Sequence, residues 1–312
     1  MDNQTYVTHF LLYEFSKNRE LQIIHFGLFM VLYLATVTGN LLIIFVIASD
    51  PHLHTPMYFF LVVLAIQDIS SVSVIFPKSM TNSLLNTRHI SYSGCVAQVF
   101  FLIFFLGFDI ALLTVMAYDR YVAICNPLQY EMVMNRKACT QMVAGSWLAA
   151  FFNAVLHTGG TFSTPFCSNV VNQFFCEIPW LIKLACSDVY QHETGAVVFS
   201  ALIACGCFIF IIVSYVQIFL VVLKLPSLQG RKKAFSTCLP HLFVFSTFLL
   251  TACLAYLWPT SSILSHLDLA FSVLYSILPP MLNPLIYSMR NKSIKVSLSR
   301  LFIFSKKDFC CM

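Results

Sequence analysis

The chain has 312 residues, of which 59% are apolar and only 10% are charged, whereas a soluble domain usually carries about 25% charged residues. So much apolar surface excludes an ordinary soluble fold and indicates that lipid surrounds the protein. The net charge of +5 is too small to indicate a nucleic-acid partner.

The first 22 residues are polar and lack the pattern of a cleaved signal peptide. Seven later segments each hold the roughly 20 apolar residues that a membrane-spanning helix needs. They lie near 23–49, 57–80, 95–126, 138–160, 193–224, 233–258 and 267–288. The sequence therefore predicts an all-α bundle of seven transmembrane helices. Its expected parts are a tail at 1–22, the bundle at 23–288, and a tail at 289–312 with a short amphipathic helix.

Lysine and arginine set the orientation of this bundle. With the N-terminus outside, 13 of these residues fall on the cytoplasmic side and 5 on the outer side, as the positive-inside rule prefers. The five outer residues are Lys17, Arg19, Lys78, Arg88 and Lys183. The same orientation exposes Asn3, in the sequon Asn-Gln-Thr, to glycosylation. We therefore expect a multi-pass plasma-membrane protein with a cytoplasmic C-terminus.

Four cysteines fall on the outer side, where the oxidising environment permits disulfides. Cys95 opens the third helix, and Cys167, Cys176 and Cys186 lie in the long loop near 161–192. Four cysteines allow three pairings, and their spacing does not choose among them. A metal site is the weaker alternative, because no tight Cys-x-x-Cys has a histidine nearby. For the terminal Cys310 and Cys311, S-palmitoylation and free thiols both stay open.

Two carboxylates lie inside predicted helices, where a charge is costly and usually functional. Asp68 lies in the second helix, and Asp109 lies in the third, about three turns before Arg120 on the same face. If the two acids approach each other, one must hold a proton or a cation must sit between them. Alternatively, polar neighbours such as Asn40 and Asn283 satisfy each acid separately.

Two intramembrane histidines carry weaker signals. His157, near the outer end of the fourth helix, is expected to be structural rather than a ligand contact. His241, near the cytoplasmic end of the sixth, is expected to serve packing or switching. No catalytic triad or phosphate-binding loop is assembled, so the sequence does not predict an enzyme.

Several motifs resemble those of the vertebrate olfactory receptors, a branch of the rhodopsin-like receptors. The most specific is Met116-Ala-Tyr-Asp-Arg-Tyr-Val-Ala-Ile-Cys125, at the end of the third helix. Others follow the same order along the chain: Gly39-Asn40, Leu53-His-Thr-Pro-Met-Tyr-Phe-Phe-Leu61, Ser214-Tyr215, Lys233-Ala-Phe-Ser-Thr-Cys238 and Pro280-Met-Leu-Asn-Pro-Leu-Ile-Tyr-Ser-Met-Arg-Asn291. The chain departs from the family pattern at Pro240, where serine is usual, and at Leu249, where tyrosine is usual.

The resemblance implies roles for matching positions. It implies that a group at the cytoplasmic side couples to the G protein: Asp119, Arg120, Tyr121, Tyr215, Asn283, Pro284 and Tyr287. It pairs Cys95 with Cys176, and Cys167 with Cys186. It also raises the expectation that Asp109 faces Asp68, with Asn40 nearby, in a sodium or proton site. No other cofactor is implied.

The resemblance places a ligand pocket in the outer half of the bundle. The residues carried over to it are Leu102, Ile103, Leu106, Gly107, Phe199, Ser200, Ile203, Cys253, Tyr256 and Ser276. The outer half of the third helix carries no carboxylate that could pair with an amine, so small, neutral, largely apolar ligands are expected. Tyr256 and Ser276 are the candidates to orient them.

The resemblance therefore implies an odorant receptor that activates a stimulatory G protein and raises cyclic AMP. A rhodopsin-like receptor for a non-odorant ligand is the first alternative. An ion-coupled transporter using Asp68 and Asp109 is the second, although no internal repeat supports it.

Overall fold

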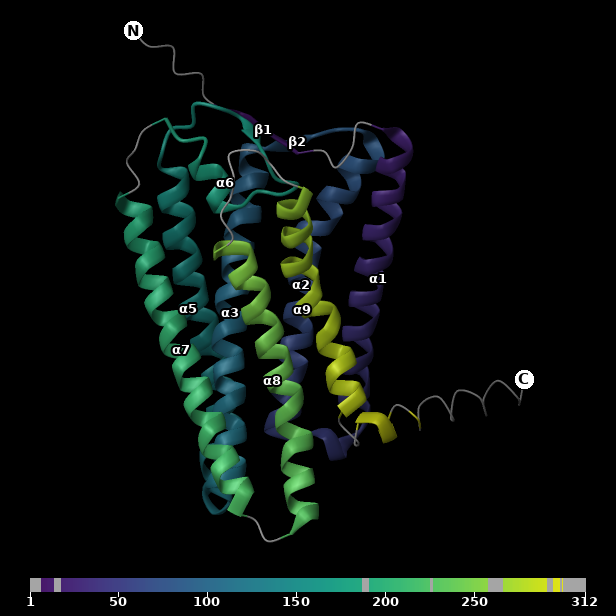
Figure 1. Ribbon diagram of the computed structural model, residues 1–312, viewed down its shortest axis with the longest axis vertical. Coiled ribbons are helices and arrows are strands. Elements are labelled where there is room, and N and C mark those ends of the chain that lie inside the picture. The colour runs from purple at the N-terminus through teal and green to yellow at the C-terminus, as the bar shows by residue number, and fades with distance from the viewer. Residues whose placement is uncertain are drawn as a thin grey trace, which may run out of the picture.

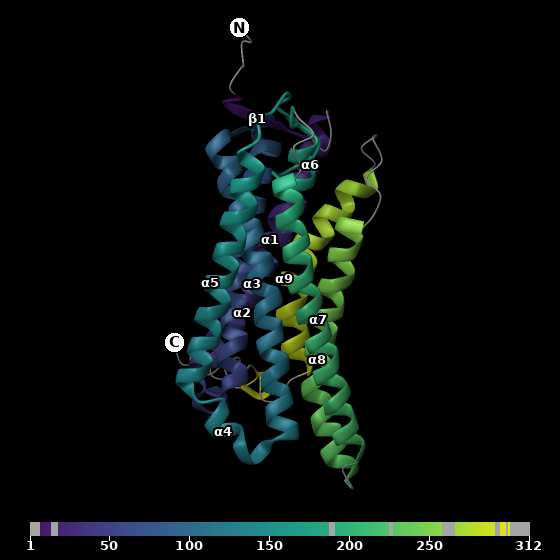
Figure 2. The same cartoon turned by 90° about the vertical axis from the view of Figure 1, so that its left-hand side faces the viewer.

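Seven long helices run side by side in the computed structural model, as Figures 1 and 2 show. The structure describes residues 7–13, 18–186, 191–224, 227–257, 266–290, 294–297 and 299. The long helices are α1 (Arg19–Ser49), α2 (Pro56–Leu85), α3 (Tyr92–Cys125), α5 (Arg136–Phe162), α7 (Gln191–Lys224), α8 (Leu228–Leu257) and α9 (His266–Arg290). The shorter ones are η1 (Pro51–Leu53), η2 (Pro127–Gln129), α4 (Tyr130–Val133) and α6 (Ile178–Ile182).

Several helices begin a few residues before the apolar segments that predict them. Asn18 caps α1 by accepting a hydrogen bond from the backbone N–H of Glu20, and Ser91 caps α3 in the same way at Gly94. Asn135 caps α5 at Ala138. Hydropathy marks only the part of a helix inside the lipid, whereas a capping side chain fixes where its hydrogen-bond ladder starts. The predicted spans are therefore correct in number and order but begin too late in the chain.

The outer surface of the bundle suits lipid. Among the described residues, five helices (α1, α2, α3, α5 and α7) are long and apolar enough to cross a membrane, and α9 carries the shorter apolar stretch Ser276–Ile286. Large apolar side chains stay exposed along these helices, including Ile24, Val31, Phe45, Phe152 and Leu202. Exposing this apolar surface to water would be unfavourable, so a hydrocarbon environment suits it.

A small sheet covers one end of the bundle, which we call the outer end; the opposite end is the inner end (Figure 1). Strand β1 (His9–Leu12) lies in the middle of the sheet. It pairs antiparallel with β2 (His89–Ser91) and parallel with β3 (Val170–Val171). The N-terminal tail thereby joins the α2–α3 connection to the α5–α7 connection. Phe10 and Leu12 point inward and are buried.

The helices α1 and α9 approach each other closely at Gly39. A Cβ atom at this position would lie 3.1 Å from Cγ of Pro284, so the contact leaves little room for a side chain. Asn40, the next residue, donates hydrogen bonds from Nδ2 to the carbonyl oxygens of Thr36 and Pro280, both at 3.0 Å. The Gly39-Asn40 pair thus joins the first helix to the last.

A helical segment at 294–297 and 299 follows α9 at the inner end. Its Ile294 and Ser297 are buried, while Lys295 and Val296 are exposed. Ser297 donates a hydrogen bond from its hydroxyl to Oδ2 of Asp50 at 2.6 Å. This contact docks the segment against the turn that follows α1.

Candidate ligand site and inner-end site

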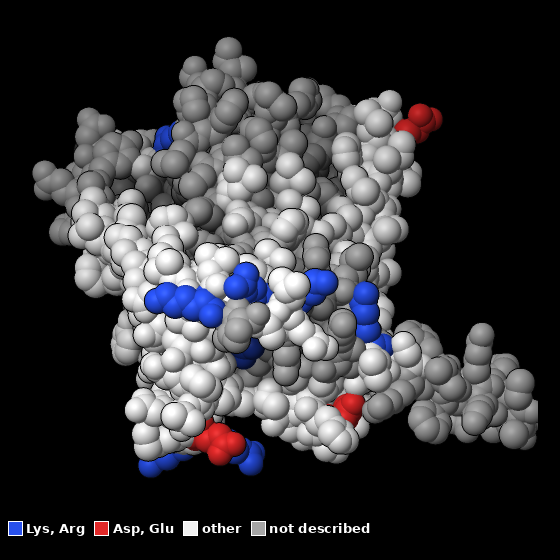
Figure 3. Space-filling view, turned by 60° about the horizontal axis from the view of Figure 1, so that its bottom comes forward, with Lys and Arg blue, Asp and Glu red and all other residues white. Residues whose placement is uncertain are grey.

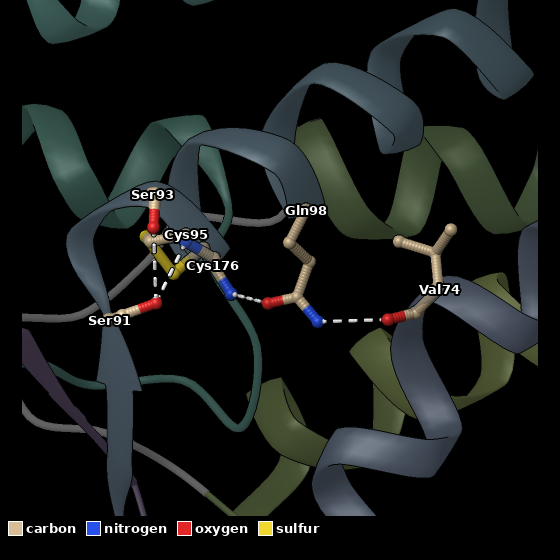
Figure 4. Close-up of a disulfide and its surroundings, with 7 residues drawn as sticks. Val74, Ser91, Ser93, Cys95, Gln98 and Cys176 are labelled. Atoms are coloured by element: carbon tan, nitrogen blue, oxygen red, sulfur yellow. Dashed lines mark hydrogen bonds between the residues drawn. A yellow bond between two sulfur atoms is a disulfide. The ribbon is translucent and has the colours of Figure 1, made fainter.

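The long connection between α5 and α7 is fastened over the outer end. The disulfide Cys95–Cys176 joins it to the first turn of α3, and Cys167–Cys186 closes it on itself. These are the pairings that the resemblance implies. Gln98 adds a second tie, because its Oε1 accepts from the N–H of Cys176 at 2.8 Å and its Nε2 donates to the carbonyl of Val74 at 3.2 Å (Figure 4). The connection therefore sits fixed above the part of the bundle that the predicted pocket occupies.

The four predicted pocket residues on α3 do not all have the same surroundings. Ile103 is buried in the main core, and Leu102 packs against a second apolar cluster formed largely by α1 and α2. Leu106 is half-buried. Gly107 faces α5, since a Cβ atom there would lie 3.6 Å from Cβ of Ala150 and 3.7 Å from Nδ2 of Asn153. This part of α3 is thus apolar except where Gly107 meets Asn153.

A polar cluster links α5 to α7 beside Gly107. Ser200 donates to Oδ1 of Asn153 at 2.6 Å, and Nε2 of His157 lies 2.8 Å from the same hydroxyl. His157 is buried. The structure therefore brings predicted pocket residue Ser200 together with His157 and with Asn153, which sequence reasoning missed. Residues 153 and 157 are one helical turn apart, so their spacing was a usable signal.

Two other predicted pocket residues on α7 are open to the surroundings. Phe199 exposes 56% of its surface and Ile203 exposes 51%. On α9, Ser276 is buried and donates to the carbonyl of Val273 at 3.0 Å. The side chains of Cys253 and Tyr256 lie outside the described residues, as does Leu249.

The intramembrane acids lie at the centre of α2 and α3. Asp68 is 2% exposed and accepts two hydrogen bonds from Nδ2 of Asn283, at 2.9 and 3.1 Å. Asp109 lies close enough to Asp68 for the two carboxylates to interact electrostatically. Its Oδ1 is buried without a hydrogen-bond partner among the described residues. Asn40 is not part of this contact, because its amide donates to backbone carbonyls.

Gln67, the residue before Asp68 on α2, also reaches α3. Its amide donates to the carbonyl of Phe105 at 2.9 Å, and its side chain also hydrogen-bonds Asp109. Asp68 has a neutral partner in Asn283, while Asp109 keeps one oxygen without a partner next to a second acid.

At the inner end of α3, Asp119 holds Arg120. Oδ2 of Asp119 accepts from Nε of Arg120 at 2.9 Å and from a terminal guanidinium nitrogen of the same residue. Its other oxygen, Oδ1, accepts from the hydroxyl of Tyr130 at 2.8 Å. Asp119 is 1% exposed, so both of its oxygens are satisfied inside the protein. Tyr130 belongs to α4 and was not predicted; no periodicity links it to the motif.

A second contact at the inner end joins α7 to α8. The hydroxyl of Tyr215 lies 2.6 Å from Nδ1 of His241, and the two rings stack with centroids 5.5 Å apart. Both residues are buried and near enough to Arg120 to interact with its charge. His241 is therefore part of the inner-end site. The side chain of Tyr287 lies outside the described residues, whereas Tyr121 is half-buried against the core.

Basic side chains gather around this inner end, as Figure 3 shows. The exposed or half-exposed members include Arg136, Lys137, Lys224, Arg231, Lys232 and Lys295. Asn3, Cys310 and Cys311 lie outside the described residues. The outer end is thus covered by a connection that disulfides fasten in place, and the inner end presents basic side chains near the Asp119–Arg120 pair. This arrangement suits a receptor that signals across a membrane.

Comparison with known proteins decides the family. The family model described as olfactory receptor matches residues 29–306. The chain belongs to the olfactory receptor family. It is 51% identical to human olfactory receptor 14I1, over 97% of this chain and 98% of that one. It is 49% identical to human olfactory receptor 14C36, over 96% and 97%. The structure also resembles squid rhodopsin, with a TM-score of 0.72 and 18% identity over 96% of this chain and 89% of the other.

Membership confirms the resemblance and the predicted bundle. The olfactory receptor is a multi-pass plasma-membrane protein of the G-protein-coupled class and not an enzyme. Its natural partners are a small-molecule ligand and a G protein. The likeness to squid rhodopsin supports the seven-helix fold alone, because the identity is low.

Proposed function

We propose that this olfactory receptor binds small, neutral, largely apolar odorants in the outer half of the bundle. The observation that carries the proposal is the chemistry of α3, since Tyr92–Phe108 holds no charged residue. An ammonium ligand would lose its hydration there without gaining a counter-ion. The Asn153–His157–Ser200 cluster supplies the polar groups that orient a ligand, in addition to the predicted Tyr256 and Ser276.

The proposed pocket lies between the α3 residues and the α5–α7 cluster. Leu102, Ile103, Leu106 and Gly107 supply its apolar side. Ser200 supplies a hydroxyl whose position is set by Asn153 and His157. A ligand with one hydroxyl, carbonyl or ester group can exchange a hydrogen bond with this cluster while its hydrocarbon part contacts α3. Phe199 and Ile203 lie at the edge of this pocket, because they are more than half exposed.

At the inner end, the proposed partner is a stimulatory G protein of the olfactory type, with cyclic AMP as the product of signalling. The Asp119–Arg120 pair is the resting contact, and ligand binding releases Arg120 toward the G protein. Tyr215 and Tyr287, with the Asn283-Pro284 hinge, support the released state. The exposed basic side chains around Arg120 favour an acidic partner surface at this face.

The two intramembrane acids form the proposed ion or proton site. Two carboxylates in one buried region cannot both stay ionised without a counter-charge. A proton or a sodium ion at Asp109, next to the Asp68–Asn283 contact, would stabilise the resting bundle. Asn40 joins α1 to α9 through hydrogen bonds from its Nδ2 to backbone carbonyls, and its Oδ1, which takes no part in these bonds, is the third proposed ligand of the site.

An odorant panel tests the ligand proposal. The full chain is expressed in cells, and cyclic AMP is measured with neutral alcohols, aldehydes, esters and hydrocarbons, and with matched aliphatic amines. We expect responses to neutral compounds and none to amines. Gly107→Val should raise the effective ligand concentration at least tenfold, because a Cβ there already touches Ala150 and Asn153, so the added methyl groups displace the cluster that positions Ser200. Gly145→Val is the matched control, since no atom lies within 4 Å of the site of its Cβ. A receptor that prefers amines would overturn the proposal.

A further inference from the structure

The outer sheet brings two histidines to the same surface. In β1 and β2, the inward positions Phe10 and Ile90 are paired and buried, while His9 and His89 are exposed. His9 lies opposite Ser91, and His89 lies opposite Leu11, so the two histidines are diagonal neighbours on the outward face. Diagonal side chains on paired strands are within reach of each other when they are long.

The distance between the two rings fits a shared metal ion. The ring centroids of His9 and His89 are 5.2 Å apart, with the planes tilted by 54°. Two imidazoles bound to one tetrahedral Zn²⁺ at about 2.1 Å have centroids about 5 Å apart, because each ring centre lies about 1.1 Å behind its nitrogen. The backbone thus holds the rings near the separation that a metal needs.

Neighbouring groups also fix the orientation of one ring. The hydroxyl of Thr8 lies 3.1 Å from Nδ1 of His9. When Nδ1–H donates to that hydroxyl, the lone pair of Nε2 is free for a metal, which is the usual way in which an outer partner orients a histidine ligand. The carbonyl of Thr8 in turn accepts from the N–H of Tyr92 at 3.1 Å, and Phe10 packs on Tyr92 beneath the sheet.

We propose that His9 and His89 form a binding site for a divalent transition cation, with Zn²⁺ and Cu²⁺ as the ions that two neutral imidazoles suit best. No group of three or more histidine, cysteine or acidic side chains gathers among the described residues, so water completes the coordination shell. The site is therefore open on one side. The ion crosslinks β1 to β2 and so fastens the N-terminal tail to the connection between α2 and α3.

This crosslink stabilises the outer end of the receptor. Strand β2 runs directly into α3, whose first turn holds Cys95 of the disulfide to Cys176. An ion that binds only the paired strands shifts the equilibrium toward the closed sheet by mass action. The proposal concerns the outer sheet and does not depend on which odorant the receptor binds.

Metal titration of the purified full-length receptor in lipid nanodiscs tests the site. Zn²⁺ should raise the thermal midpoint, and Cu²⁺ should give an electron paramagnetic resonance spectrum with two nitrogen ligands. His9→Ala and His89→Ala should each lower the metal affinity at least tenfold. The double variant should lose little further affinity, because either single substitution already removes the shared site. Thr8→Val should weaken binding roughly tenfold, since it removes the orienting partner.

The control is His52→Ala, which removes an exposed histidine at the inner end. Its metal response should match that of the wild type. The proposal fails if the two single substitutions have small, additive effects like separate single-histidine sites. It also fails if the Zn²⁺-dependent midpoint shift survives in the double variant. Both outer histidines are exposed, so surface expression in the variants should stay near the wild-type level.

Discussion

The hydroxyl of Tyr130 donates a hydrogen bond to Oδ1 of Asp119 at 2.8 Å, on the side of the carboxylate opposite Arg120. Asp119 is therefore held from two directions, by the next residue on α3 and by a tyrosine on α4. Burial, followed by the charge of Asp119, raises the pKa of Tyr130, so the phenol stays protonated and remains a donor at physiological pH. The connection between α3 and α5 thus takes part in the resting contact of the receptor.

Tyr130→Phe should raise basal signalling and lower the thermal midpoint. The substitution keeps the ring and leaves a buried carboxylate oxygen without its donor, which costs about 1–3 kcal/mol in the resting state. Basal cyclic AMP and thermal unfolding measure the two effects. Tyr118→Phe is the matched control, because it removes the hydroxyl of the residue next to Asp119, whose carboxylate accepts its hydrogen bonds from Arg120 and Tyr130. Equal behaviour of the two variants would contradict a role for Tyr130.

Arg120→Ala should abolish ligand-evoked cyclic AMP while surface expression is largely kept. The guanidinium is the group that the proposed mechanism releases toward the G protein, and no other charged side chain of α3 can replace it. Asp119→Asn should act in the opposite direction and raise basal signalling, because the neutral amide holds the arginine less strongly. A full cyclic-AMP response in Arg120→Ala would refute the proposed coupling role.

Asp109→Asn should change both basal signalling and its dependence on sodium concentration. The substitution keeps the shape of the side chain and removes one of the two charges that call for a proton or cation. Asp68 then keeps its hydrogen bonds from Asn283. Signalling measured in sodium-containing and sodium-free medium reports the effect. Unaltered basal activity and salt response would show that the acids are satisfied separately.

The contact of Asp50 with Ser297 should give a stability that depends on pH. The hydroxyl of Ser297, and then the backbone N–H of His52, lower the pKa of Asp50 from 3.8 to about 2. Because the folded pKa is depressed, this stability is fully present above pH 4 to 5 and is lost as the pH falls toward about 2. The difference in thermal midpoint between wild type and Asp50→Asn should therefore shrink below about pH 4.

Ser297→Ala tests the same contact from the other side. It removes the strongest of the hydrogen bonds that lower the pKa of Asp50, so it should reproduce part of the loss seen in Asp50→Asn near neutral pH. Ser299→Ala, at a position that is exposed, is the control. A midpoint difference between wild type and Asp50→Asn that stays constant from pH 6 to pH 3 would contradict the assigned contact.

Much of the inner-end site could be predicted, because its residues are neighbours in the chain. Asp119 and Arg120 are adjacent, and a helix at the membrane edge suffices to place them. Tyr130 and His241 complete the same site from α4 and α8, and local sequence does not say which side chain a loop or a distant helix delivers to Arg120. In the outer half, Gly107 and Ser200 were predicted, but Asn153 was not, and His157 was assigned to structure alone.

Hydropathy and the distribution of Lys and Arg are enough to predict seven membrane spans with the N-terminus outside, because these signals act over whole segments and need no tertiary contact. The family can also be read from the sequence, because its motifs are short runs of residues that follow one another in order along the chain. The partners of the isolated polar groups become visible only in the folded protein. Asp68 accepts its hydrogen bonds from Asn283 rather than Asn40, and His9 meets His89 across a sheet that no periodicity predicted. Such contacts join residues far apart in the chain, so their geometry is set by the packing of the helices and by the pairing of the loops.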